Sequence, residues 1–211
     1  MNAPLLPPGL TIPEALIVLM HDTKGYVVQN VPPQGLVATA ELIEACIQGQ
    51  LRLADEKVFA AASPSDSQRS WVDDLRQGVP VDGVPVAEWL RANGAALDRQ
   101  RKLAAQAGVV RAEGHKLFGL MKYERYVPQD AARETVVDAM RNAPQTDVRA
   151  AELARLVIRG NLLPAIGTDE QTSATIEQLA QHGQGPGAPG RSLDGTDIAT
   201  AAILYGTIAG F

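Results

Sequence analysis

The chain is poor in aromatic side chains, which make up only 4% of its 211 residues. A core of this size must therefore be built from Leu, Val, Ile and Ala, and such residues, with Ala prominent, favour packed helices over a β-sandwich. Cysteine is nearly absent as well: with Cys46 alone, no disulfide can form within the chain, which fits a reducing cytoplasm. These absences predict a mostly α-helical protein.

Long hydrophobic runs are also missing. The longest apolar stretch, residues 198–211, has 14 residues, fewer than the roughly 17 to 25 that a membrane-spanning helix needs. The opening "MNAPLLPPGL" has no basic start, and its prolines interrupt any apolar segment, so it does not resemble a secretory signal. We expect a cytoplasmic protein that does not cross a membrane, although it can lie against one peripherally.

The residues that usually carry catalysis or bind metals do not form recognisable patterns. His21, His115 and His182 are far apart, and none has a metal-ligand spacing to another His or to Cys46. No phosphate-binding loop, dinucleotide-binding glycine motif or nucleophile elbow occurs. The sequence therefore predicts no enzyme, no metal site and no cofactor. We interpret His21 and Asp22 as the polar end of a buried helix, where the chain returns to water.

Apolar periodicity and turn residues predict the order of the elements. A first helix begins at Thr11 and Glu14, which form a capping box, and residues 24–29 are predicted as a turn followed by a short strand. Residues 32–35 are predicted as a loop, and 50–63 as a hairpin that turns at 55–56. Further helices are expected at 36–48, after 63–68, within 86–94, and at 95–107, 129–142, 146–159 and 168–182.

A second hairpin is predicted over 108–128. Val109 and Val110 are expected to pair with Leu117 and Phe118 across a turn at 112–116, "AEGHK". After the last of the expected helices, residues 183–195 are rich in Gly and Pro and predict a loop. Residues 196–211 predict a terminal apolar helix that packs on the same domain, which itself spans 10–182.

The order helix, strand, helix, strand, strand over the first 63 residues resembles a winged-helix arrangement. Its second helix, however, carries Glu41 and Glu44 and no Lys or Arg. Because contacts to phosphate dominate DNA affinity, an acidic recognition helix argues against DNA binding. We predict a winged-helix-like packing unit and no nucleic-acid partner.

Basic residues gather in the centre of the chain. Residues 91–133 carry nine basic and four acidic side chains, whereas both flanking segments are net acidic and the whole chain has a net charge of −5. Such a segment favours an anionic partner. The alternative is that these cations only pair with the acidic flanks.

Two groups of candidate residues lie in or beside this basic segment. The candidate residues for an anion or a lipid headgroup are Arg91, Arg99, Arg101 and Lys102. The candidate membrane or oligomer contacts, on the hairpin, are Leu117, Phe118, Lys122, Tyr123 and Arg125. Basic side chains beside exposed apolar ones can hold a protein to an anionic membrane surface. The apolar hairpin residues can equally be core or oligomer contacts, so both interpretations stay open.

Five short motifs in a fixed order resemble the Golgi phosphoprotein 3 family over residues 10–182. They are "LTIPE" at 10–14, "DTKG" at 22–25, "GLVATAEL" at 35–42, "GQL" at 49–51, and the hairpin at 108–128. The resemblance implies a central helical bundle surrounded by further helices, with a protruding β-hairpin at 109–126. It also implies a peripheral membrane adaptor: eukaryotic members bind phosphatidylinositol 4-phosphate and the cytoplasmic tails of glycosyltransferases, and their hairpin takes part in oligomerisation and membrane contact.

The headgroup pocket of the family is not retained in this sequence. The loop after the first strand, "VVQNVPPQ", lacks the Trp of the family, and Val37 stands where the family has an Arg. Two further pocket arginines correspond to Gly94 and Leu97. The sequence looks like that of a bacterial member. We therefore expect an adaptor for anionic lipid headgroups without the specific pocket, and as the alternative a soluble, oligomerising protein–protein interaction module that binds no lipid.

Overall fold

The computed structural model describes residues 9–28, 32–62, 64, 69–117, 120–166 and 169–182. Within these ranges the protein is mostly helical, with eight helices, a three-stranded antiparallel sheet and a two-stranded one. The predicted fold class is confirmed to that extent, while the winged-helix-like grouping stays a prediction. None of the helices in this part of the chain is both long and apolar enough to span a bilayer. The predicted loop at 183–195 and terminal helix at 196–211 lie outside the described residues, as does Phe118.

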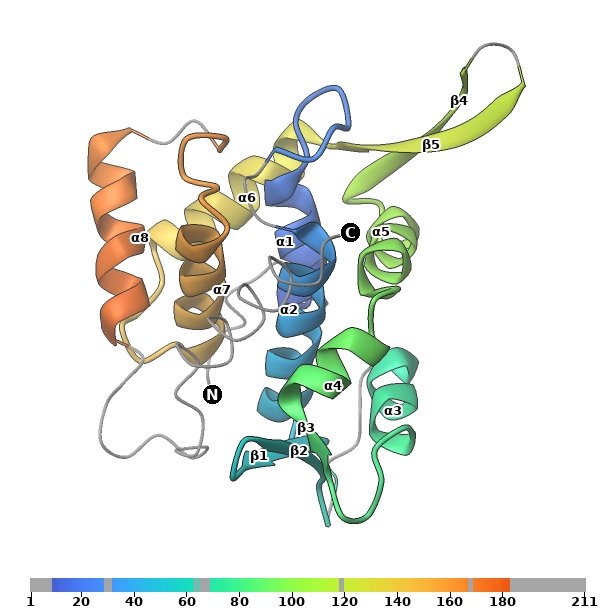
Figure 1. Cartoon of the computed structure of the whole chain (residues 1–211). Helices are drawn as coiled ribbons and strands as arrows, with labels where there is room; N and C mark the ends of the chain where they lie inside the picture. The colour runs from blue at the N-terminus through green and yellow to red at the C-terminus, as the bar shows by residue number, and fades with distance from the viewer. Residues whose placement is uncertain are drawn as a thin grey trace.

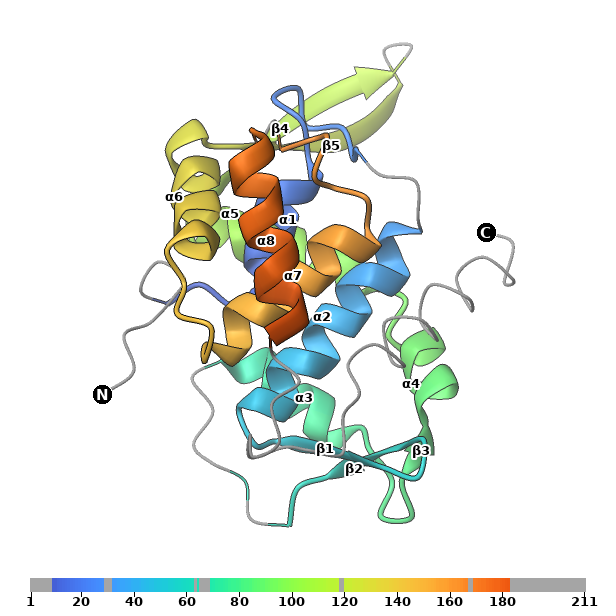
Figure 2. The same ribbon diagram turned by 90° about the vertical axis from the view of Figure 1, so that its left-hand side faces the viewer.

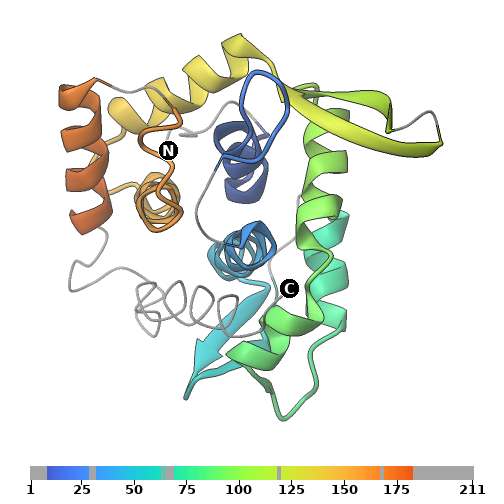
Figure 3. The ribbon, with the colours of Figure 1, turned by 45° about the horizontal axis from the view of Figure 1, so that its top comes forward.

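Helices α1 (Ile12–Met20) and α2 (Pro33–Ile47) lie side by side in the middle of the molecule. Figure 3 shows α5 on one side of this pair, with α6, α7 and α8 on the other. All nine residues of α1 are buried, because the capping box of Thr11 and Glu14 satisfies its amino end and every face of the helix meets a neighbour. The predicted start of α1 is confirmed.

The other helices surround this pair. They are α3 (Ser70–Gln77), α4 (Val86–Ala92), α5 (Ala96–Gln106), α6 (Asp130–Arg141), α7 (Val148–Arg159) and α8 (Glu170–His182). Their positions confirm the predicted helices, and Figure 2 shows α8 packed against α7. One boundary was wrong: residues 33–35 belong to α2 and not to a loop. Pro33 occupies the first position of the helix, where its missing N–H costs nothing.

The three-stranded sheet lies at one end of the molecule. Strands β1 (Leu51–Ala54) and β2 (Lys57–Ala60) form the predicted hairpin, and the short β3 (Val84–Pro85) adds a strand that the sequence did not predict. Of the turn and short strand predicted over 24–29, the turn is present, whereas the described part of the strand forms only a bridge between His21 and Val27. There the side chain of Asp22 accepts hydrogen bonds from two backbone amides and closes a tight turn.

Strands β4 (Val110–Leu117) and β5 (Met121–Pro128) form a hairpin that projects from the helical body (Figure 1). The predicted turn at 112–116 is wrong, because those residues continue β4 and the register pairs Leu117 with Met121. Gly114 suggested a turn, yet it lies in the strand opposite Glu124. The hairpin is therefore longer than predicted, and it lies against the end of α5.

Candidate anion-binding cleft

A cleft of about 660 Å³ lies between α5 and the inner face of the β4–β5 hairpin. Residues opposite each other in an antiparallel pair share a face, and along each strand every second residue returns to it. Gly114, Lys116, Lys122, Glu124 and Tyr126 therefore occupy one face of the hairpin. Asp98, Arg101 and Lys102 line the opposite wall from a single face of α5, since they are three and four residues apart. His115 and Tyr123 also contribute to the lining, although their pairing places them on the opposite face of the hairpin.

The cleft carries an excess of positive charge. Its lining holds four permanent cations and two carboxylates. Lys116 and Lys122 lie directly opposite each other on neighbouring strands, a placement that destabilises a hairpin when nothing lies between the two charges. One carboxylate oxygen of Glu124 already has a partner, because it accepts a hydrogen bond of 2.6 Å from the hydroxyl of Tyr126. An anion bound between the lysines would relieve their repulsion.

Arg101 lies at the base of the cleft, where α5 meets the hairpin. Its guanidinium carbon lies 5.5 Å from the centre of the Tyr126 ring, and Nη1 lies 3.5 Å from Asp98. Its Nε donates a hydrogen bond of 3.1 Å to Nε2 of His21, at the end of α1. Arg101 therefore connects the cleft to the core of the protein.

His21 is completely buried, so the expectation that it returns to water at the end of the helix is wrong. Its Nδ1 lies 2.8 Å from the carbonyl oxygen of Ile17, and this contact requires the proton on Nδ1 and leaves Nε2 as an acceptor. Burial, with a smaller contribution from the charge of Arg101, lowers the pKa of His21 to about 4. His21 is therefore neutral at pH 7. Its backbone carbonyl accepts a hydrogen bond from Arg133 of α6.

The four residues predicted as an anion site are not brought together. Arg101 and Lys102 line the cleft, whereas Arg91 lies exposed on α4 and does not. Arg99 turns inward and binds the buried carboxylate of Glu41 through Nε and Nη2, at 2.9 and 2.5 Å. A charge that already neutralises a buried carboxylate adds little attraction for a further anion. For Arg99 the alternative interpretation, a salt bridge to an acidic part of the chain, describes the structure.

The five candidate residues on the hairpin also separate. Lys122 and Tyr123 line the cleft. Arg125 shares the face of Tyr123, opposite to that of Lys122; its guanidinium stacks on Tyr26 at 4.4 Å and donates to the hydroxyl of Tyr123 at 2.9 Å. The backbone of Leu117 ends β4, and Phe118 lies outside the described residues.

Sequence reasoning missed Asp98 and Glu124 as lining residues, and it placed Lys116 and Tyr126 in the basic segment without selecting them as candidates. The alternation of 114, 116, 122, 124 and 126 could have found the hairpin members once the turn was placed correctly. The turn region exposes apolar side chains: Leu120 is 88% exposed and Met121 is 66% exposed. The tip thus presents apolar groups beside the cations of the cleft.

Outside the cleft, the described residues offer little other chemistry. They contain no group of three or more His, Cys, Asp or Glu side chains placed to hold a metal ion. Burial raises the pKa of the Cys46 thiol to about 12, so it is protonated at neutral pH and is a poor nucleophile. The cleft is therefore the feature of this part of the chain that best fits a ligand.

Comparison with known proteins identifies one family. The family model described as Golgi phosphoprotein 3 (GPP34) matches residues 12–193, which include α1, α5 and the hairpin. A comparison with curated proteins gave no match. The matched residues cover most of the chain and contain every residue of the cleft.

Proposed function

The chain belongs to the Golgi phosphoprotein 3 family, and from this membership we propose that it is a peripheral membrane adaptor that binds anionic lipid headgroups in the cleft between α5 and the β4–β5 hairpin. The observation that carries the proposal is the gathering of Arg101, Lys102, Lys116 and Lys122 around one cleft. Each basic residue close to an anionic membrane surface contributes about 1 kcal/mol to binding.

The shape of the molecule supports membrane contact through the hairpin. The hairpin projects away from the helical body, so its tip can reach a membrane before the rest of the protein (Figure 1). The exposed side chains of Leu120 and Met121 can enter the interface between headgroups and acyl chains, while Lys122 stays at the level of the phosphates.

The proposed ligand is an anionic phosphate headgroup in general. Val37, Gly94 and Leu97 stand where the resemblance places the arginines of the phosphatidylinositol 4-phosphate pocket. Of these, Val37 and Leu97 are buried in the core and cannot reach a ligand. We therefore expect binding to follow the surface charge of the membrane, without preference for a phosphoinositide.

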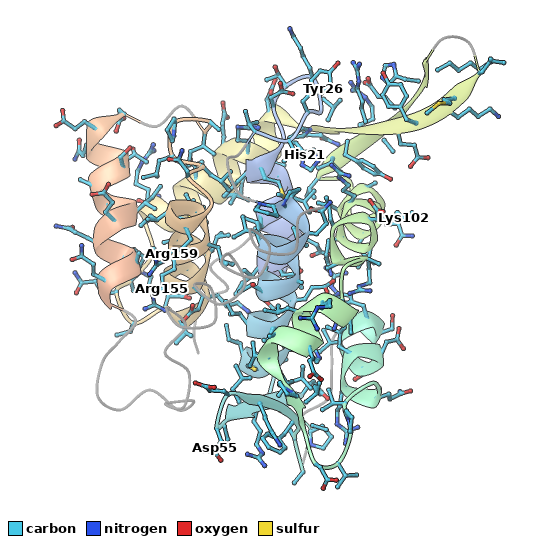
Figure 4. The ribbon with its side chains drawn as sticks, viewed as in Figure 1. His21, Tyr26, Asp55, Lys102, Arg155 and Arg159 are labelled. Atoms are coloured by element: carbon cyan, nitrogen blue, oxygen red, sulfur yellow. The ribbon has the colours of Figure 1, made fainter. Side chains whose placement is uncertain are left out.

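Co-sedimentation with vesicles tests the proposal. Wild-type protein should bind phosphatidylcholine vesicles that contain phosphatidylglycerol, and should not bind pure phosphatidylcholine. Lys122→Glu changes the charge by two, which corresponds to about 2 kcal/mol and about 30-fold weaker binding. Arg159→Glu is the matched control, because Arg159 is exposed on α7, across the molecule from Lys102 (Figure 4). Equal effects of the two charge reversals would show that only net charge matters, and would overturn the proposal that the cleft is the binding site.

Filling the cleft separates a shaped site from diffuse attraction. A Cβ atom added to Gly114 meets nothing within 4 Å, and the backbone there is not left-handed, so Gly114→Ile should fold without strain. Its side chain would occupy the face that carries Lys116 and Lys122. We expect unchanged thermal stability and at least about fivefold weaker vesicle binding, since displacing one contact group costs about 1 kcal/mol. Unchanged vesicle binding would refute a defined headgroup site.

The exposed tip also favours the alternative, a module that oligomerises through the hairpin without binding lipid. Apolar side chains as exposed as Leu120 and Met121 often mark contacts with another protein. Under this alternative, Leu120→Ser with Met121→Ser would reduce the mass measured by light scattering, and wild-type protein would ignore anionic vesicles. An unchanged mass would count against it.

A further inference from the structure

Arg101 is held at the base of the cleft by a residue eighty positions earlier in the chain. We propose that His21 is a positioning residue: its buried Nε2 accepts the Nε–H of Arg101 and thereby turns the outer end of the guanidinium toward an anion in the cleft. The inference rests on the proposed function, because it assigns His21 a role in that same site.

The orientation of the His21 ring is set from inside the protein. Nδ1 donates to the carbonyl oxygen of Ile17, one turn earlier in α1, so the ring cannot rotate without losing a buried hydrogen bond. Arg133 binds the backbone carbonyl of His21 from α6 and holds the end of α1 in place. The acceptor that faces α5 is thus fixed by groups that do not themselves line the cleft.

The imidazole of His21 binds the Nε side of the Arg101 guanidinium and leaves the two Nη groups facing outward. Nε is taken by His21, while Nη1 has a long contact of 3.5 Å to Asp98, which is itself largely exposed. No closer partner of the two Nη groups is found among the described residues. Two parallel N–H groups of one guanidinium match two oxygens of a phosphate, so this end suits a bidentate contact.

A neutral His21 is required for this arrangement. A protonated imidazole has no acceptor and would place a second positive charge 3.1 Å from Arg101. The complete burial of the ring keeps it neutral. A lysine or arginine at position 21 could not replace it, because either would offer only donors.

A double-mutant cycle tests the coupling between the two residues. The probe is phosphatidylcholine vesicles that contain phosphatidylglycerol. His21→Leu should weaken vesicle binding about fivefold, because an arginine without its inner partner must be immobilised on binding. In an Arg101→Gln background the same substitution should have no further effect on binding. The loss of thermal stability caused by His21→Leu should remain in both backgrounds.

The conservative variant His21→Gln supplies an acceptor oxygen and should retain most of the affinity. If His21→Leu weakens binding equally with and without Arg101, its role is structural and the inference is overturned. If His21→Leu does not fold, the informative comparison is between His21→Gln and Arg101→Gln. Vesicle binding by His21→Gln that is as weak as that of Arg101→Gln would then overturn the inference.

A measurement without ligand separates the two proposals. The Nε–H of Arg101 should give a slowly exchanging proton resonance in wild type and in His21→Gln, and should lose its protection in His21→Leu. Unchanged protection in His21→Leu would overturn positioning by His21 while leaving headgroup binding intact. A protected Nε–H in a wild-type protein that ignores anionic vesicles would overturn the proposed function, and the role of His21 in it.

Discussion

Acid should destabilise this protein through His21 before its carboxylates are protonated. The ring is neutral in the folded state because burial lowers its pKa from 6.5 to about 4, whereas in the unfolded chain it titrates near its ordinary value. Between these two values the unfolded state binds one more proton than the folded state. Stability therefore falls as the pH decreases through this window, and it is retained above pH 6.5.

The size of the effect follows from the pKa difference. A decrease from 6.5 to about 4 corresponds to about 3 kcal/mol below both values, at roughly 1.4 kcal/mol per pKa unit. Between about pH 7.5 and about pH 5 the expected loss is about 2 kcal/mol, since most of the window has then been crossed. This is a considerable fraction of the roughly 5 to 15 kcal/mol that stabilises a typical domain.

Urea denaturation at a series of pH values measures this effect. The comparison is between wild type and His21→Gln, which keeps a hydrogen-bond acceptor and does not titrate. Every other ionisable group is common to both proteins, so the difference between their free energies of unfolding isolates His21. Wild type should lose about 2 kcal/mol more than the variant over that range. Parallel pH profiles would refute the assignment of a buried, neutral His21.

Three further substitutions test individual contacts and backbone conformations of the fold. Arg99→Met should cost about 2 kcal/mol of unfolding free energy, because it leaves the buried carboxylate of Glu41 without its cation. Adding Glu41→Gln should restore at least half of that loss, and additive losses would argue against an interaction between the two residues. Gly25→Ala should cost at least about 1 kcal/mol and speed hydrogen exchange at the base of the hairpin, since Gly25 has φ +78° and an added Cβ lies 3.0 Å from that of Arg125; wild-type exchange would contradict this close packing. Glu56→Gly should raise stability by about 1 kcal/mol, because Glu56 has φ 58° in the β1–β2 turn, and an unchanged melting temperature would show that this conformation carries no strain.

The helices could be predicted because their signals are local. The capping box of Thr11 and Glu14, the apolar periodicity and the turn residues between segments placed α1 and the later helices to within a few residues. The Asp55-Glu56 turn was found for the same reason. The second hairpin was harder: Gly114 looked like a turn residue, and only the pairing of Leu117 with Met121 shows that the strand continues past it.

The candidate site could be predicted only in part. Charge along the chain pointed to the segment that contains Arg101, Lys102 and Lys122, and these residues do line one cleft. Charge alone could not tell Arg101 from Arg99, two positions earlier. The difference lies in the partners: Arg99 meets a carboxylate of α2, and Arg101 meets a neutral histidine of α1.

The sequence by itself determined the helical composition of the described chain, the membership in the Golgi phosphoprotein 3 family and the basic character of the central segment. Those properties depend on neighbouring residues and on their order. The tertiary structure decided which cations remain available to a ligand, because that depends on side chains contributed by distant elements. His21 shows this most clearly: in the sequence it is the last polar step of a helix, and in the fold it is a buried acceptor that faces Arg101.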